Sequence, residues 1–297
     1  MALFAFGLLA LSSVDQAGRQ AGTFPGPTVT SVDRPAIDRL RGGGKSNAVD
    51  FVTTAVVSIQ VVGGAYGYAD PEGNFKAFGG LPDDAPVTDV EVNMMRYCAT
   101  QQLLAGATLL AGQECGQLAA ECVALSGNAL GVLANIAGFR ESMGGNAPPA
   151  IAAWVATLAA LGEARKRKLG KEAGAVGITL LGLASLQAFV QPKRCYEVYK
   201  GPKASDAALA FLSLGAANQF ASTAYLAVAR RAKNKGHEKG LLVALLTNAI
   251  ATLKFGVLDA DKAGFEKVGS FVWTAVVSLL ASVVKAKSSS AAVEESD

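Results

Sequence analysis

Two similar stretches of sequence indicate how the chain folds: "DPEGNFKAFGG" at residues 70–80 and "QPKRCYEVYKG" at residues 191–201. Each has a proline in second place, then two aromatic residues three positions apart, and ends in glycine. The matched pairs are Pro71 and Pro192, Phe75 and Tyr196, Phe78 and Tyr199, and Gly80 and Gly201. A recurrence at a fixed distance indicates a duplicated structural unit.

The repetition continues along the chain in the same order and with nearly the same spacing. Further matched residues are Asn128 and Asn248, Trp154 and Trp273, and Gln101-Gln102 with Asn218-Gln219. The chain is therefore predicted to hold two copies of one unit, at residues 47–168 and 169–287. Residues 1–46 form a signal-like, transit-like or extended arm, and residues 288–297, "SSSAAVEESD", are predicted to be disordered.

The composition is that of a membrane protein. Hydrophobic residues make up 51% of the chain and charged residues 17%, whereas soluble domains carry about 25% charged residues. Apolar runs that recur at short intervals predict eight helices, several long enough to cross a bilayer. They cover residues 49–68, 94–113, 118–139, 148–164, 173–190, 206–229, 240–258 and 268–285.

The predicted fold is all-α and polytopic, with about eight transmembrane helices in two tandem four-helix bundles. Because four is even, both copies cross the membrane in the same sense, as a parallel repeat. The repeated stretch is then the connector after the first helix of each copy, where proline ends the helix and aromatic rings sit at the membrane interface.

Loop charges predict the orientation. The loops at 163–172 and 230–239 are rich in Lys and Arg, and both lie on one side in an eight-helix count. The loop at 69–93 lies on the other side and is acidic. By the positive-inside rule, the basic loops and both termini face the cytosol, or the stroma of a plastid.

The order of features in each copy resembles the small four-helix membrane proteins of the DoxX-like group. A first span is followed by an aromatic-x-x-aromatic-Gly connector ("FKAFGG", "YEVYKG"), a span with mid-membrane amides, and two closing spans. The resemblance covers most of both halves through short motifs. It implies a compact four-helix bundle per copy. It carries over no catalytic residue, because the group is functionally diverse.

The leader points to a compartment. Residues 1–14, "MALFAFGLLALSSV", are apolar but too short to span a bilayer, and a Ser/Thr/Pro/Arg-rich arm follows to residue 46. This arrangement resembles plastid precursors of algae with secondary plastids, which implies a plastid thylakoid membrane. A membrane-surface or buried segment, and another organelle membrane, stay open. The paired Glu and Arg of the three-helix antenna family are absent from the sequence, while peripheral binding of chlorophyll, carotenoid or lipid stays open.

Polar residues inside the predicted membrane helices are the candidate site residues. The candidates for binding are Gln101, Gln102, Asn128, Asn218, Gln219 and Asn248, with Gln60, Asn135 and Gln187 as further intramembrane amides. The plainest interpretation is hydrogen bonding between helices. A binding site at the bundle centre and ligation of pigment or lipid are the alternatives. The predicted interface anchors are Phe75, Phe78, Trp154, Tyr196, Tyr199 and Trp273.

Other chemistries find little support. The four cysteines form no C-x-x-C pair and His237 is the only histidine, so no metal site is predicted. A net charge of +3 does not indicate a nucleic-acid partner. Glu114 and Glu121 are expected at the membrane interface, and His237 is expected to be exposed. No catalytic motif is visible in the sequence, so an enzyme is not predicted.

The sequence favours a non-catalytic accessory or linker subunit of a larger membrane complex. With the leader, that complex is a photosystem-antenna supercomplex in a plastid thylakoid, and the partners are lipid and other subunits. The alternative is a carrier or channel for a small solute that uses the mid-membrane Gln and Asn residues.

Overall fold

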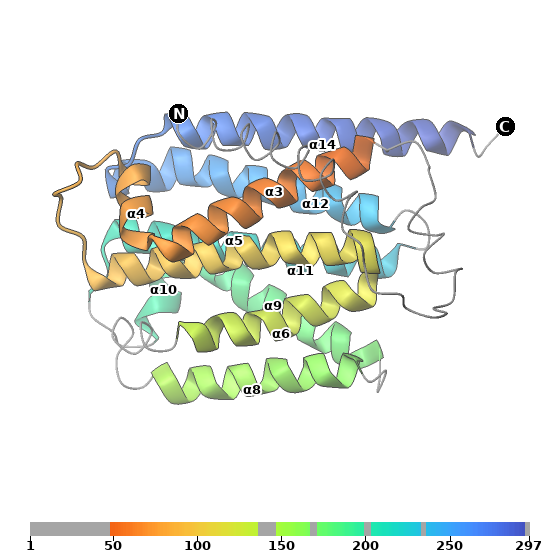
Figure 1. The fold of residues 1–297 in the computed structure, drawn as a ribbon, viewed down its shortest axis with the longest axis horizontal. Coiled ribbons are helices and arrows are strands. Elements are labelled where there is room, and N and C mark those ends of the chain that lie inside the picture. The colour runs from red at the N-terminus through yellow and green to blue at the C-terminus, as the bar shows by residue number, and fades with distance from the viewer. Residues whose placement is uncertain (1–47, 136–146, 167–170, 199–202, 233–235, 295–297) are drawn as a thin grey trace, which may run out of the picture.

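The computed structural model describes residues 48–135, 147–166, 171–198, 203–232 and 236–294, and within them every regular element is a helix (Figure 1). The prediction of an all-α fold is therefore confirmed. The elements are α3 (Ala48–Ala69), α4 (Pro71–Gly79), α5 (Asp89–Cys115), α6 (Gln117–Ala134), α8 (Ala147–Lys166), α9 (Lys171–Val190), α10 (Pro192–Glu197), α11 (Asp206–Arg231), α12 (Gly236–Lys254), the π-helix η1 (Phe255–Asp259), α13 (Ala260–Ala263) and α14 (Val268–Glu294). The arm at residues 1–46 lies outside the described residues.

The two connectors are short helices rather than extended segments. Pro71 and Pro192 each occupy the first turn of a new helix, where the missing backbone N–H is not needed and the fixed φ suits a helix. In α4, Asp70 Oδ1 accepts from the Gly73 N–H at 2.9 Å, and Gly80 ends the helix with a φ of 60°. The preceding helices α3 and α9 end just before these prolines, as predicted, and each proline also begins a new helix.

The second helix of each copy begins at a well-defined cap. Thr88 and Glu91 form a reciprocal capping box at the start of α5. At the start of α11, Ser205 Oγ accepts from the Ala208 N–H at 3.1 Å. The two caps also meet, because the Ser205 hydroxyl donates to Glu91 Oε1 at 2.6 Å. The helices α5 and α11 therefore start side by side.

These two helices run parallel through the middle of the molecule. Near their starts, Gly215 of α11 lies against Tyr97 and Cys98 of α5; near their ends, Gly112 of α5 lies against Tyr225 of α11. A side chain at either of these two glycines would collide with the facing helix. Each of the central helices carries the first helix of its own copy, α3 on α5 and α9 on α11.

The first helix of each copy also packs against the last helix of the other copy. α3 packs against α14, the last helix of the second copy, and α9 packs against α8, the last helix of the first (Figure 1). Both halves of the chain begin with a long helix, a short connector helix and a central helix, but two separate tandem bundles are not confirmed. Each side of the molecule is built from helices of both copies around α5 and α11.

Three helices are long and apolar enough to span a membrane, among the residues that the structure describes. They cover Glu172–Val190, Gly236–Ala263 and Val268–Lys285. Eight spans therefore remain a prediction. The central helices α5 and α11 do not meet the same criterion, and both carry buried amides and small polar residues.

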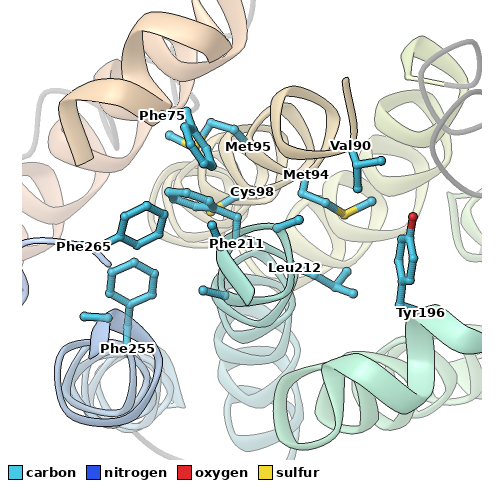
Figure 2. Close-up of a cluster of buried hydrophobic side chains, with 14 of the residues drawn as sticks. Phe75, Val90, Met94, Met95, Cys98, Tyr196, Phe211, Leu212, Phe255 and Phe265 are labelled. Atoms are coloured by element: carbon cyan, nitrogen blue, oxygen red, sulfur yellow. The ribbon is translucent and has the colours of Figure 1, made fainter. Parts of the chain in front are cut away.

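Aromatic rings fill the end of the bundle at which α5 and α11 begin. Phe211 of α11 lies 5.4 Å from the rings of both Phe75 and Phe265, and Phe255 stacks on Phe265 at 5.8 Å between centroids (Figure 2). Such pairs add about 0.5–1.5 kcal/mol each beyond the area they bury. The repeated connector thus contributes Phe75 to a protein core.

The C-terminal end differs from the prediction. The tail predicted as disordered from residue 288 begins inside α14, which continues to Glu294. Alanine and glutamate in this stretch have high helix propensity, so the helix can extend beyond the bundle at little cost.

Candidate functional site

Amides of the two copies meet at the centre of the bundle. Gln219 of α11 donates from Nε2 to Oδ1 of Asn128 of α6 at 2.6 Å. Asn128 in turn donates from Nδ2 to the carbonyl of Ala124 at 2.7 Å. Both side chains are buried. This pair joins the second copy to the first through two of the predicted site residues.

A second amide group lies within the second copy. Asn248 of α12 donates from Nδ2 to Oδ1 of Asn218 at 3.0 Å, and its own Oδ1 accepts from the Trp273 indole N–H at 3.0 Å. Three helices are tied together by these two bonds. The structure therefore brings Asn218, Asn248 and Trp273 together, and places Trp273 as a partner of a buried amide.

The remaining two predicted amides behave differently from each other. Gln101 is 1% exposed, and among the described residues neither its Oε1 nor its Nε2 has a hydrogen-bond partner. Thr108, two turns further along α5, is likewise buried with an unpartnered hydroxyl. Gln102 is half-buried and lies against Gly63 of α3. Gln101 is the amide that packing between helices explains least.

A small pocket lies beside this interior. Its volume is about 10 Å³, and it is bounded by α3, α5, α11, α12 and α14. Its polar lining comes from Gln60, Ser222, Asn248 and Trp273. Gln60 is 5% exposed and its Oε1 is another buried atom without a protein partner in the described part of the chain.

A charged cluster joins both copies at the other end of the bundle, where α5 and α11 finish. Glu121 of α6 forms ion pairs with Arg165 of α8 and, at 3.5 Å, with Arg230 of α11. Gln117 donates to Glu121 Oε1 at 2.7 Å. Glu121 is fully buried in protein, and its predicted place at the membrane interface stays a prediction. Glu114, expected to lie beside it, is exposed.

A second ion pair, which is partly buried, was not predicted from the sequence. Lys254, at the end of α12, donates to Asp259 Oδ2 at 2.6 Å and to Ser213 Oγ at 2.9 Å. Its ammonium also lies 5.5 Å from the centroid of the Phe189 ring. The π-helix η1 brings the lysine and the aspartate together. The signal in the sequence was a lone lysine inside the seventh apolar run.

His237 is part of the interior contacts. Its Nδ1 shares a hydrogen bond of 2.7 Å with the Tyr225 hydroxyl, and the side chain is half-buried. The expectation of an exposed histidine is therefore wrong. Among the described residues no three His, Cys, Asp or Glu side chains gather as they would around a metal ion.

The predicted interface anchors lie in several environments. Phe75 and Tyr196 are buried in protein. Phe78 and Trp154 are partly buried against the same core cluster. Tyr199 lies outside the described residues. On α10, burial raises the pKa of the Cys195 thiol and of the Tyr196 phenol.

Comparison with known proteins adds no relative: no family model, no curated protein and no solved structure matches this chain. The functional argument therefore rests on the chain's own residues.

Proposed function

We propose that this chain is an eight-span integral membrane protein that serves as a non-catalytic accessory or linker subunit of a larger membrane complex. The observation that carries the proposal is the pairing of interior amides with one another. Gln219 bonds to Asn128, and Asn248 bonds to Asn218 and Trp273. Interhelical bonds of this kind contribute roughly 0.6 kcal/mol each in membranes. They suit a scaffold whose interior holds its own helices in place.

The outer surface supports the same proposal. Large apolar side chains are exposed along α9, α12 and α14, the three helices that meet the criterion for a membrane span. Those on α9 are Val176, Leu180, Leu183, Leu186 and Val190. Exposed apolar area on this scale favours contact with lipid or with apolar helices of other subunits. Peripheral chlorophyll, carotenoid or lipid would bind on such faces.

The charge distribution supports an orientation. Arg165 and Arg230, which flank the two basic loops, both contact Glu121, so these loops share one end of the bundle. The acidic connector after α3 starts at the opposite end. With the plastid-like leader, we place the basic end and both termini on the stromal side of a thylakoid membrane, in a photosystem-antenna supercomplex.

The test is native-gel migration of the mildly solubilised protein, with absorption spectra of its band. The proposal expects a pigmented band far above the 30.3 kDa of the chain. A colourless monomer or small oligomer would contradict it.

A small-solute carrier is the second candidate, and one observation favours it. Gln101 and Thr108 on α5 are buried with polar atoms that no described residue satisfies, and such atoms are costly unless something binds them. A carrier would move solute alone in liposomes, and Gln101→Leu would abolish the flux. Equal flux with and without the substitution would remove this candidate.

A further inference from the structure

The pocket beside α3 holds an unsatisfied acceptor. Gln60 lines it, is 5% exposed, and no described residue donates to its Oε1. Leaving a buried acceptor unpaired costs about 1–3 kcal/mol. A duplicated protein provides an internal comparison, because the other copy shows how the same position packs without an amide.

The two copies can be aligned from contacts as well as from sequence. In the first copy Val61 of α3 lies against Gly106 of α5. In the second copy Gly182 of α9 lies against Thr223 of α11. Val61 and Gly182 are 121 positions apart, the distance between the two connector prolines. Gln60 therefore corresponds to Leu181.

The corresponding position in the other copy is filled with leucine. Leu181 is 1% exposed. Val277, which lines the pocket, corresponds at the spacing of the two tryptophans to Leu158, which is 0% exposed. Both leucines are buried, one of them larger than Val277 and the other apolar where Gln60 is polar. At these two positions the lining of the pocket therefore differs from the corresponding residues of the other copy.

We propose that the pocket beside Gln60 binds one water molecule, which bridges α3 of the first copy to α11 and α12 of the second. A volume of about 10 Å³ is near the minimum that a single water needs. A bound water needs two to four polar partners. The water donates its first hydrogen bond to Gln60 Oε1, and it makes its other two hydrogen bonds with two side chains that line the pocket.

Those side chains have unused capacity. The Ser222 hydroxyl donates to the Gln219 carbonyl at 2.9 Å, so its oxygen is free to accept from the water. Asn248 uses Oδ1 for Trp273 and one Nδ2 hydrogen for Asn218, which leaves one hydrogen to donate. The site therefore selects a small neutral molecule that donates two hydrogen bonds and accepts one.

The experiment is water-to-amide cross-relaxation by NMR on the full chain in detergent, with ¹⁵N-labelled glutamine and tryptophan. A long-lived water gives cross-peaks from the solvent resonance to the Gln60 side-chain amide and to the Trp273 indole. Val277→Leu, which introduces the residue of the other copy, fills the pocket and abolishes both cross-peaks while Gln60 remains.

Two results would overturn the proposal: no cross-peak at Gln60 in the native protein, or cross-peaks of unchanged intensity in Val277→Leu.

A second variant, Gln60→Met, keeps the length of the side chain and so should leave the fold intact. In a Trp154→Phe protein it should shift the Trp273 emission to shorter wavelength. The matched control is Gln60→Met in a Trp273→Phe protein, where Trp154 should not respond.

Discussion

At the scale of single residues, Glu121 is a charged side chain that is fully buried between helices. It is buried at the start of α6 and neutralises two arginines that come from different copies. The helix α9 also approaches this carboxylate closely at Gly174, where a side chain would collide with it. Four helices therefore meet around a single carboxylate.

Glu121→Gln should destabilise the protein. The change leaves Arg165 and Arg230 without their counter-ion, and losing one partner of a buried pair typically costs about 3–5 kcal/mol. Because the arginine side chains are 14% and 25% exposed, we expect a loss nearer to about 2 kcal/mol. Thermal unfolding in detergent measures it.

Glu114→Gln is the matched control, since that glutamate is exposed one short turn away. It should change the free energy of unfolding by less than about 0.5 kcal/mol. Equal effects of the two substitutions would refute the role assigned to Glu121.

At the scale of elements, contacts between helices depend on glycines at the crossing points. A Cβ at Gly64 of α3 would lie 2.7 Å from the Leu103 backbone nitrogen and 2.8 Å from the Ala99 carbonyl oxygen of α5. Backbone atoms cannot rotate away, so α3 would have to move. This is the reason for the small residues that recur in the sequence of this helix.

Gly64→Ala should therefore lower the unfolding temperature, with a cost of about 1–3 kcal/mol from overpacking. Gly269→Ala on α14 is the matched control, because nothing lies within 4 Å of the added carbon. Alanine is favoured over glycine in a helix by roughly 1 kcal/mol, so this variant should be at least as stable as the native protein. A Gly64→Ala protein of native stability would contradict the packing described for α3.

Helices were largely predictable from the sequence, and their partners were not. The predicted run at 206–229 is observed as Asp206–Arg231, because length and apolarity determine a helix locally. The contacts of α3 with α14 and of α9 with α8, which join the two copies, could not be predicted, since periodicity does not say which helix a face will meet. The ion pairs of Glu121 were not predicted because its two arginines lie far away in the sequence. The ion pair of Lys254 was missed because η1 sets its contact with Asp259.

At the scale of the whole molecule, neither copy is complete alone. The first helix of each copy packs on the last helix of the other, and α5 packs along α11. The two halves therefore share one interior, although one polypeptide links them.

Expression of residues 1–168 and 169–297 as separate chains should yield a complex that co-purifies. Each half needs the other to cover its central helix. Gly215→Leu should break the association, since a side chain there would lie 2.9 Å from the Cys98 Cα of the other half; Gly269→Leu should not. Halves that purify as stable, separate monomers would show that the copies fold independently.

The central claim is that the polar central helices cross the membrane together with the three apolar ones. It is tested by labelling single cysteines in sealed vesicles with an impermeant maleimide, with Cys98, Cys122 and Cys195 changed to alanine. Cys115, exposed at the end of α5, is one reporter; Asp84→Cys, in the loop before α5 of a Cys115→Ala protein, is the other. The account predicts that they react from opposite sides of the membrane. Reaction of both from the same side would mean that α5 does not span, and would contradict the eight-span arrangement.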